Sequence, residues 1–337
     1  MIKVAINGFG RIGRPTFRRI LSDHPDIEII AINDLTDNKT LAHLLKYDSL
    51  YGRYEKSVEY TDNLLIIDGK EFKILAEPDP EKLPWGKLGV DIVLECSGYF
   101  ADLEGASKHI KAGAKKVVIS APCKSESVPH FVLGVNEEKY DAEKDNVISM
   151  GSCTTNCLAP MVKVIYENFG IEAGLMTTIH SYTNDQRLLD LPHKDLRRAR
   201  AAALSMIPTT TGAAIAVTRT IPELIGKIDG ISVRVPTPTV SLTDFTANVL
   251  KTVSADEIND AFEKAAKSEK LKGILAVEKE LLVSADFKGN SFSAIIDLAS
   301  TMVQGKNLIK VLGWYDNEWG YACRLAEFAE FIGKQIK

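Results

Sequence analysis

The sequence predicts an α/β protein with a doubly wound parallel-sheet domain, followed by an α+β domain with a largely antiparallel or mixed sheet. Its 337 residues exceed the size of one average domain. Short runs that are apolar on both parities alternate with helical stretches such as 12–22 and 102–112; the runs lie at 3–7, 27–33, 90–97, 117–120 and 147–149. After residue 152 the candidate strands become half-polar, at 174–180, 231–235, 240–250 and 308–314.

The residue pattern of each group of elements gives a physical reason for the predicted structure. Strands that are apolar on both parities are covered on both faces, and their alternation with helices implies right-handed crossovers and a parallel sheet. Alternating polarity after residue 152 predicts a sheet with one face against the rest of the protein. Residues 254–257 read SADE, a capping box that starts a helix. We therefore predict a dinucleotide-binding domain at 1–151, completed by a C-terminal helix at 318–337, and a catalytic domain at 152–317.

The amino-acid composition argues against several classes of function. Apolar residues make up 45% and charged residues 26% of the chain, typical of a globular protein. A formal net charge of −4 gives no sign of a dedicated nucleic-acid or acidic-membrane partner. Five cysteines without a C-x-x-C pair argue against a disulfide scaffold and against a metal site. With no signal peptide or membrane-length apolar run visible, we expect a cytoplasmic protein.

A glycine motif follows the first predicted strand and opens a helix. Gly8 permits a tight turn, Gly10 lets the backbone approach a pyrophosphate, and Gly13 allows close packing of helix on strand. Asp34 follows about twenty residues later, at the end of the second strand, as this fingerprint requires. Its carboxylate can accept hydrogen bonds from ribose hydroxyls but would repel a 2′-phosphate. The motif therefore predicts a Rossmann-type domain that binds NAD and not NADP.

The best candidate nucleophile is Cys153, within the segment SCTTNC at 152–157. This segment follows a strand and leads into an apolar helix, so the helix N-terminus would stabilise a thiolate there. Cys157, one turn later, would point into the packed helix and be inert. His180 ends a β-run and begins a long polar loop, which makes it the candidate base.

Five segments, in this order, resemble the signatures of phosphorylating, NAD-dependent glyceraldehyde-3-phosphate dehydrogenases. They are NGFGRIGR at 7–14, SCTTNC at 152–157, HSYTNDQ at 180–186, RVPTP at 234–238 and GWYDNEWGY at 313–321. The resemblance runs from residue 4 to near the C-terminus. It implies oxidation and phosphorylation of D-glyceraldehyde 3-phosphate to 1,3-bisphosphoglycerate, through a thiohemiacetal and a thioester on the cysteine. It also implies a homotetramer, in which an S-shaped loop at about 182–203 reaches a neighbouring subunit's cofactor.

The resemblance also assigns roles to residues. Cys153 and His180 would be catalytic. The cofactor would be bound by Asn7, Gly8, Gly10, Arg11, Ile12, Gly13, Asp34, Ser97, Ser120, Asn317 and Tyr321. The substrate phosphate would be bound by Thr183, Asp185 and Arg234. Inorganic phosphate would be bound by Ser152, Thr154, Arg198, Thr211 and Gly212. Hydroxyls, arginines and backbone amides all suit phosphate oxygens.

The chain departs from the family pattern at a few positions. Met150 and Gly151 replace the more usual Asn-Ala, and Ser97 stands where threonine is common. Ile215 replaces a lysine, which removes a positive charge that we expect to lie near the phosphate region. None of these changes affects Cys153 or His180.

Other functions remain open at this point. Erythrose-4-phosphate dehydrogenase shares much the same motifs, but the full set of inorganic-phosphate ligands favours the phosphorylating enzyme. Aspartate-semialdehyde dehydrogenase shares the cysteine logic, but the close signature match argues against it. A redox-sensing or binding protein on the same fold is a third alternative, because an accessible low-pKa thiol oxidises readily.

Overall fold

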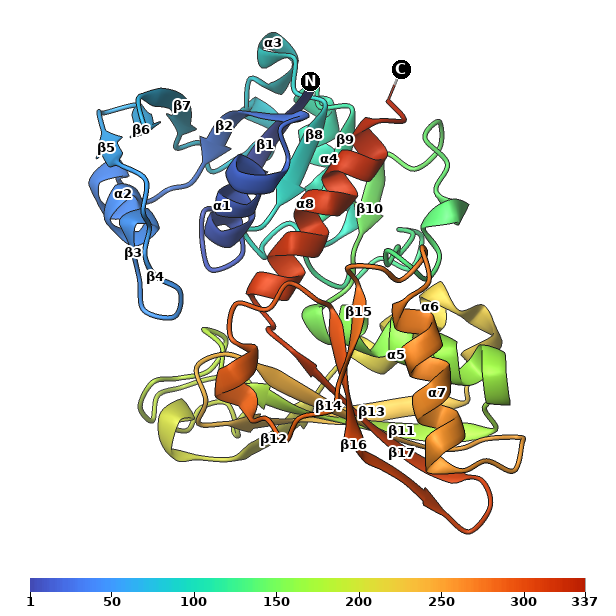
Figure 1. The fold of residues 1–337 in the computed structure, drawn as a ribbon. Helices are drawn as coiled ribbons and strands as arrows, with labels where there is room; N and C mark the ends of the chain where they lie inside the picture. Colours follow the sequence, from blue (N-terminus) through green and yellow to red (C-terminus); the bar gives the residue numbers. More distant parts are fainter. Residues whose placement is uncertain (337) are drawn as a thin grey trace. The chain divides into compact units, whose positions relative to one another are not determined.

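The computed structural model describes residues 1–336, which form two compact units (Figure 1). The first contains residues 1–131, 138–151 and the C-terminal segment from Ala322. The second contains residues 132–137 and 152–321.

The first unit is built on an eight-stranded sheet in the order β10-β9-β8-β1-β2-β7-β6-β5. The strands are β1 (Ile2–Asn7), β2 (Ile27–Asn33), β5 (Val58–Tyr60), β6 (Leu64–Ile67), β7 (Lys70–Leu75), β8 (Ile92–Glu95), β9 (Lys116–Ile119) and β10 (Val147–Ser149). Those from β10 to β7 are parallel, and β6 and β5 run antiparallel. Because β1 pairs with β2 on one side and β8 on the other, the strand order reverses at β1, where doubly wound sheets bind ligands. The predicted fold of this unit is confirmed.

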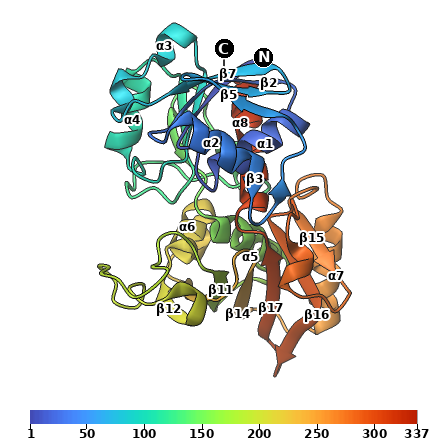
Figure 2. The ribbon, with the colours of Figure 1, turned by 90° about the vertical axis from the view of Figure 1, so that its left-hand side faces the viewer.

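Helices complete the first unit. They are α1 (Gly13–Asp23), α2 (Asn38–Lys46), α3 (Trp85–Leu88) and α4 (Leu103–Lys111), and the short strands β3 (Tyr47–Asp48) and β4 (Gly52–Arg53) form a separate hairpin. The C-terminal helix α8 (Trp319–Gly333) runs beside α1 (Figures 1 and 2). His24, just after α1, lies 2.5 Å from Glu330 of α8, and Phe328 stacks on Phe131 at 6.2 Å. The predicted helix at 318–337 is therefore too long, since α8 ends at Gly333.

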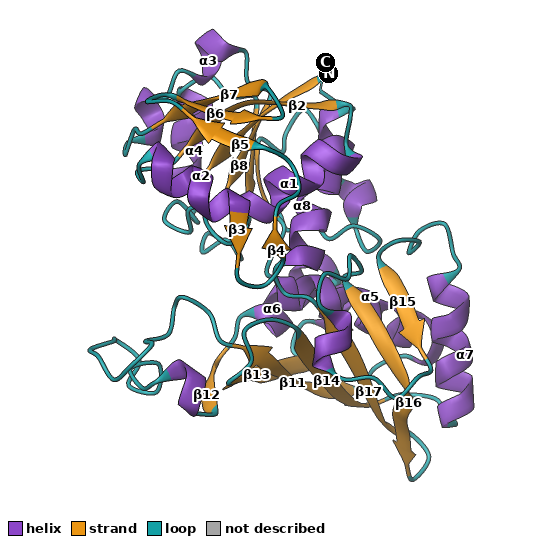
Figure 3. Cartoon of the chain, turned by 60° about the vertical axis from the view of Figure 1, so that its left-hand side comes forward, coloured by secondary structure: helices purple, strands orange, loops and turns teal. Residues whose placement is uncertain are grey.

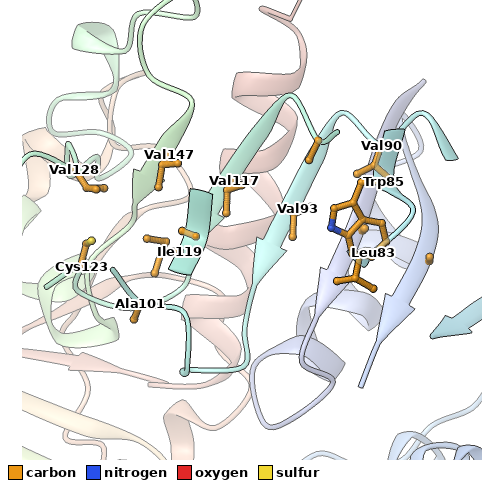
Figure 4. Packing of buried hydrophobic residues seen from close by; sticks show 14 residues of the cluster. Leu83, Trp85, Val90, Val93, Ala101, Val117, Ile119, Cys123, Val128 and Val147 are labelled. Carbon is orange, nitrogen blue, oxygen red and sulfur yellow. The ribbon is translucent and has the colours of Figure 1, made fainter. Parts of the chain in front are cut away.

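The core of this unit gathers side chains of the sheet, of α4 and of the residues around α3, several of which are labelled in Figure 4. Side chains of β8 and β9, including Val93 and Val117, pack with Leu83, Trp85 and Val90 from the segment that carries α3. Trp85 is completely buried there. An indole N–H in such a place needs a hydrogen-bond acceptor.

The second unit contains a seven-stranded mixed sheet in the order β12-β13-β11-β14-β17-β16-β15. The strands are β11 (Ala173–Ser181), β12 (Ile207–Thr210), β13 (Ile228–Val235), β14 (Ser241–Asn248), β15 (Leu275–Glu278), β16 (Ala294–Gln304) and β17 (Leu308–Tyr315). β11 is parallel to β13 and β15 is parallel to β16, while the other neighbours are antiparallel. The predicted mixed sheet is confirmed.

Helices α5 (Cys153–Phe169), α6 (Ala213–Thr220) and α7 (Ala255–Ala266) cover one face of this sheet (Figure 3). The Ser254 hydroxyl accepts from the Glu257 amide at the start of α7, and the Glu257 carboxylate accepts from the Ser254 amide, as the capping box predicts. On the opposite face, β11 exposes Leu175 and β13 exposes Ile231. The long loop from residue 182 to 206 includes one short 3-10 turn, Ala202–Leu204.

Candidate active site

Helix α5 presents Cys153 at its first position. Gly151, just before it, has φ of +64°, a left-handed conformation that favours glycine. Ser152 is the N-cap: its hydroxyl accepts from the Thr155 amide at 3.0 Å, and the Thr155 hydroxyl accepts from the Ser152 amide at 3.2 Å. This reciprocal pair fixes the first turn, so the position of the Cys153 side chain is set by the backbone.

His180 lies within reach of Cys153. It is near the end of β11, is 4% exposed, and its Nε2 lies 3.5 Å from Cys153 Sγ. Both residues belong to the second unit, so this distance is internal to one compact body. The structure brings together the two residues that the sequence predicts as nucleophile and base.

The other ring nitrogen of His180 has two neighbours. Its Nδ1 lies 2.8 Å from the Ser181 carbonyl and 3.0 Å from Nη1 of Arg234. Arg234 is directly opposite His180 in the parallel pairing of β13 with β11, which places both side chains on the same face. A carbonyl only accepts and a guanidinium only donates, so the two neighbours favour opposite tautomers of the imidazole.

Burial dominates the electrostatics of the pair. It raises the pKa of the Cys153 thiol, although Arg234 and the hydrogen bonds at Thr154 act to lower it. Burial and the Arg234 charge together lower the pKa of His180 to about 3. This differs from the sequence-based expectation of a thiolate stabilised by the helix N-terminus, because the cost of removing the thiol from water outweighs that effect. The resting pair is a neutral thiol beside a neutral imidazole, ready to accept the thiol proton.

Two predicted anion ligands of the first set lie together. Arg234 Nη1 is 3.4 Å from the Thr183 hydroxyl, next to the Cys153–His180 pair. Asp185, predicted for the same site, instead forms an ion pair with Arg198 of the second set. The sequence-based prediction assigns Asp185 and Arg198 to two separate anion sites. In the structure, the ion pair between these residues links the two sites.

The second set comes from three places: the start of α5, the loop 182–206 that carries Arg198, and the residues just before α6. Arg198 Nε donates to the Thr209 hydroxyl at 2.9 Å, and the Thr211 hydroxyl accepts from the Ala213 amide at 3.2 Å at the start of α6. Gly212 faces open space, since an added Cβ would meet no atom within 4 Å. Thr154 turns inward, and its hydroxyl pairs with Tyr315 at 2.8 Å.

Tyr315 is a residue that the sequence analysis did not single out. Its hydroxyl lies 2.8 Å from both Thr154 and Thr178, and its ring stands edge-on to His180 at 6.1 Å. Tyr315 is 1% exposed, so it forms the floor beneath the pair. Its place in the GWYDNEWGY segment was the signal that could have identified it.

A separate cavity of about 640 Å³ lies in the first unit, at the carboxyl ends of β1, β2 and β8. Five predicted cofactor residues line it: Asn7, Gly8, Gly10, Asp34 and Ser97. The sequence analysis missed the others: Asn33, Leu35, Glu77, Pro78, Cys96, Tyr99 and Phe100.

The cavity walls fit a dinucleotide. Gly8 has φ of +92°, and a Cβ there would lie 2.5 Å from the Ser97 amide nitrogen. Gly10 borders open space, so its backbone is accessible to a phosphate. One Asp34 oxygen accepts from the Phe9 amide at 2.7 Å and the other from the Thr36 amide at 2.9 Å, which holds the carboxylate at the cavity edge.

The remaining predicted cofactor residues lie elsewhere. The Arg11 guanidinium turns to Asp48 at 2.6 Å, Ile12 is the N-cap of α1, and Gly13 packs against the Gly8 carbonyl. Ser120 directly follows β9. Asn317 and Tyr321 belong to the second unit, outside this cavity.

Asn317 is held in a defined orientation. Its Oδ1 accepts hydrogen bonds from the hydroxyls of Ser181 at 2.9 Å and Ser241 at 3.0 Å. Two hydroxyls on the oxygen leave the amide nitrogen as the donor to a ligand.

No helix among residues 1–336 is long and apolar enough to cross a membrane. Within the same residues, no group of three or more His, Cys, Asp or Glu side chains is placed to hold a metal ion.

Comparison with known proteins places both units in one family. Residues 2–103 match the model of the glyceraldehyde 3-phosphate dehydrogenase NAD binding domain, and residues 152–317 match that of the C-terminal domain. The chain is 57% identical over 334 residues to a glyceraldehyde-3-phosphate dehydrogenase of Geobacillus stearothermophilus. It is 55% identical to one of Streptomyces coelicolor and 54% identical to glyceraldehyde-3-phosphate dehydrogenase 1 of Bacillus subtilis. In all three comparisons, 99% of each chain is covered.

Proposed function

Because this chain belongs to the glyceraldehyde-3-phosphate dehydrogenase family, we propose that it converts D-glyceraldehyde 3-phosphate, NAD and inorganic phosphate to 1,3-bisphosphoglycerate. The observation that carries this proposal is the Cys153–His180 pair at 3.5 Å, with Arg234 against the far side of the imidazole. A nucleophile, a base and a fixed cation beside them suit an aldehyde that carries a phosphate.

In the first step, Cys153 Sγ attacks the aldehyde carbon and a carbon–sulfur bond forms. His180 Nε2 takes the thiol proton and returns it to the aldehyde oxygen, which gives a thiohemiacetal. The neutral imidazole suits this role, because burial and Arg234 keep His180 unprotonated across the physiological range. Proton transfer between the two residues creates a thiolate and an imidazolium together, and each stabilises the other.

His180 then removes the hydroxyl proton of the thiohemiacetal. When bound, NAD supplies the acceptor for the hydride that leaves this carbon. The carbon itself stays attached to Cys153 as a thioester. An oxygen of inorganic phosphate attacks the thioester carbon, the carbon–sulfur bond breaks, and the acyl phosphate leaves. Cys153 departs as a thiolate and recovers its proton from His180.

We assign the two anions to the two arginines. Arg234, next to Thr183 and the Cys153–His180 pair, would hold the substrate phosphate. Arg198, beside Thr209 and the start of α6, would hold inorganic phosphate together with Thr211 and Gly212. The Asp185–Arg198 ion pair occupies that guanidinium in the ligand-free protein, so phosphate would compete with a carboxylate for it.

Ile215 differs from the sequence-based expectation, which put this position near the phosphate region. Its side chain lines a surface hollow with Leu175 and Ile225, and does not lie among the phosphate ligands. The departure from lysine therefore adds apolar surface there, and the phosphate residues stay complete.

The assembly and location are also part of this proposal. Exposed apolar side chains in the loop 182–206 and on the outer face of the second unit's sheet support a homotetramer. None of the five cysteines, all of which lie in the described part of the chain, forms a disulfide, which supports a reducing compartment such as the cytoplasm.

The direct test follows NADH formation from glyceraldehyde 3-phosphate and NAD, with and without inorganic phosphate, for the unaltered protein and for Cys153→Ser. We expect sustained turnover that requires phosphate and disappears in the variant. A single burst of NADH that phosphate cannot extend would contradict the proposal. That result would favour erythrose 4-phosphate as substrate, or a thiol sensor on the same fold.

A further inference from the structure

A chain of buried polar side chains crosses the carboxyl ends of three neighbouring strands of the first unit, directly behind the cofactor cavity. We call it the polar belt, and its members are Asn33 on β2, Asn7 on β1, Glu95 on β8 and His109 on α4. The mechanism above does not use Glu95 or His109, and neither lines the cavity. Glu95 is 2% exposed and His109 is 0% exposed.

Glu95 is the centre of the belt. One carboxylate oxygen accepts from Asn7 Nδ2 at 2.5 Å and from His109 Nε2 at 3.0 Å. The other accepts from the Ser97 amide at 2.8 Å and from the Ser97 hydroxyl. Three of these four donors belong to Asn7 and Ser97, which line the cavity. A buried carboxylate that accepts four hydrogen bonds holds its donors firmly in place, because each of these bonds is charge-assisted.

The orientation of His109 is set from below. Trp85 Nε1, buried in the core of Figure 4, lies 3.0 Å from His109 Nδ1. An indole nitrogen can only donate, so Nδ1 must accept and the ring proton must sit on Nε2, where it points at Glu95. The ring of His109 also meets Phe100, a residue of the cavity wall, edge-on at 6.3 Å.

The belt reaches the opposite wall through amides whose orientations are equally determined. Asn7 donates to Glu95, so its Oδ1 is free to accept from Asn33 Nδ2, at 2.7 Å. The Asn33 side chain in turn binds both the carbonyl of Glu77, at 3.0 Å, and its amide, at 2.9 Å. Glu77 lines the cavity on the far side from Ser97. One carboxylate thus sets the direction of every hydrogen bond from Ser97 to Glu77.

We propose that Glu95 and His109 are positioning residues for NAD, which hold Asn7, Ser97 and Glu77 in the arrangement that the cofactor cavity requires. His109 acts through Glu95, and Trp85 acts through His109. This role of His109 depends on its hydrogen-bond donor and not on the size of its ring. If the ring kept its shape but lost the donor, the hydrogen bonds of the polar belt would no longer be held in one direction.

The test measures the dissociation constant of NAD by calorimetry on the full-length, ligand-free protein. In His109→Phe the ring remains but neither nitrogen does, so Glu95 loses a donor and Trp85 an acceptor. We expect NAD to bind roughly tenfold more weakly, the scale of a lost buried hydrogen bond to a charged group. His109→Gln can still donate to Glu95 and accept from Trp85, and should bind within about threefold of the unaltered protein.

A second buried histidine provides the matched control. His24 also pairs with a carboxylate in the first unit, that of Glu330, but has no contact with the belt. His24→Phe should lower the melting temperature without changing NAD affinity. NAD affinity that is unchanged in His109→Phe, or lost equally in His109→Gln, would overturn the proposal and reduce His109 to a packing residue.

Two further measurements keep the test decisive. If His109→Phe does not fold, Glu95→Gln is measured in its place. An amide side chain cannot accept from Asn7, His109 and Ser97 together, so this variant should also bind NAD more weakly. Alkylation of Cys153 by iodoacetamide in the ligand-free protein should proceed at an unchanged rate in the belt variants. Since neither measurement uses aldehyde or phosphate, failure of this inference is distinct from failure of the proposed chemistry.

Discussion

At the scale of single residues, His180 is contacted from several sides by other groups of the active site. Cys153 faces its Nε2, while the Ser181 carbonyl and the guanidinium of Arg234 share its Nδ1. The ring edge of Tyr315 closes another side, and Asp185 and Arg198 lie further out beside Arg234. Because Arg234 and burial both oppose an imidazolium, the histidine becomes a strong acceptor only when Cys153 carries the compensating negative charge.

This coupling makes a prediction about pH. A thiolate that arises by proton transfer to His180 has a population independent of pH between the two pKa values, since no proton leaves the pair. His180 has a pKa of about 3 and burial raises that of Cys153, so the window covers neutral pH. Because the neutral pair is the resting form, we expect the rate of Cys153 alkylation by iodoacetamide in the unaltered protein to fall as the pH drops below the raised pKa of Cys153. On the acid side it should level off at the constant rate that proton transfer within the pair supports.

His180→Asn should remove that plateau. Without an internal acceptor, the thiolate forms only by losing its proton to water, so the alkylation rate should fall about tenfold for each pH unit below the raised pKa of Cys153. Turnover should fall by roughly 100-fold or more, the usual contribution of a general base. Mass spectrometry of the Cys153 peptide measures the alkylation profile. A plateau that persists in His180→Asn would mean that another group accepts the proton.

The sequence could identify these residues but not their electrostatics. Cys153 and His180 follow from residue type and from their positions at element ends. The direction of the Cys153 pKa shift depends on how much water the folded site excludes, which no local pattern encodes. Tyr315, Glu95 and His109 were not predicted for a related reason. Tyr315 lies 161 positions from Thr154 and Glu95 lies 14 positions from His109, so only tertiary packing brings these partners together.

At the scale of elements, the glycine motif joins strand β1 to helix α1, and its glycines have different duties. A Cβ at Gly13 would lie 2.2 Å from the Gly8 carbonyl oxygen, a backbone atom that cannot move aside cheaply. A Cβ at Gly10 would meet nothing within 4 Å. Gly13 therefore serves the packing of helix on strand, while Gly10 leaves room for a ligand.

Two alanine variants separate these duties. Gly13→Ala should lower the melting temperature by roughly 5 °C, since overpacking of this kind costs about 2 kcal/mol. Gly10→Ala should leave the melting temperature of the ligand-free protein unchanged but weaken NAD binding, because the new methyl group occupies the approach of the pyrophosphate. Differential scanning fluorimetry, with and without NAD, measures both effects. Equal melting temperatures for the two variants would contradict this division.

Elements with a strong periodic pattern were predicted well from sequence. Strand β2 has the predicted bounds, and α1 and α4 lie within one residue of theirs. The strands β5 to β7 were not predicted, because many of their residues are exposed or half-buried, unlike the continuously buried β8 and β9. Strand β16 was also missed: its first half is continuously buried and its second half is mostly exposed, so neither pattern spans it.

At the scale of the whole molecule, the second unit carries two separate apolar surfaces. One is the outer face of its sheet, with Leu175 and Ile231. The other is the loop 182–206, where Leu188 is 79% exposed and Leu196 is 83% exposed. A tetramer with two kinds of two-fold contact needs two different surfaces, and we propose these two exposed apolar surfaces for that role.

These surfaces lead to a prediction about assembly that distinguishes them. A buried aspartate without a partner disfavours an interface strongly, so Leu175→Asp should reduce the proposed tetramer to dimers, and so should Leu188→Asp. The double variant should sediment as a monomer, because both contacts are then lost. Leu281→Asp changes a leucine that is 90% exposed outside both surfaces, and should leave the assembly intact. Sedimentation velocity measures all four. An unaltered protein that sediments as a monomer would remove the proposal of a homotetramer, whereas monomers from one substitution alone would mean that the two surfaces contribute to a single contact.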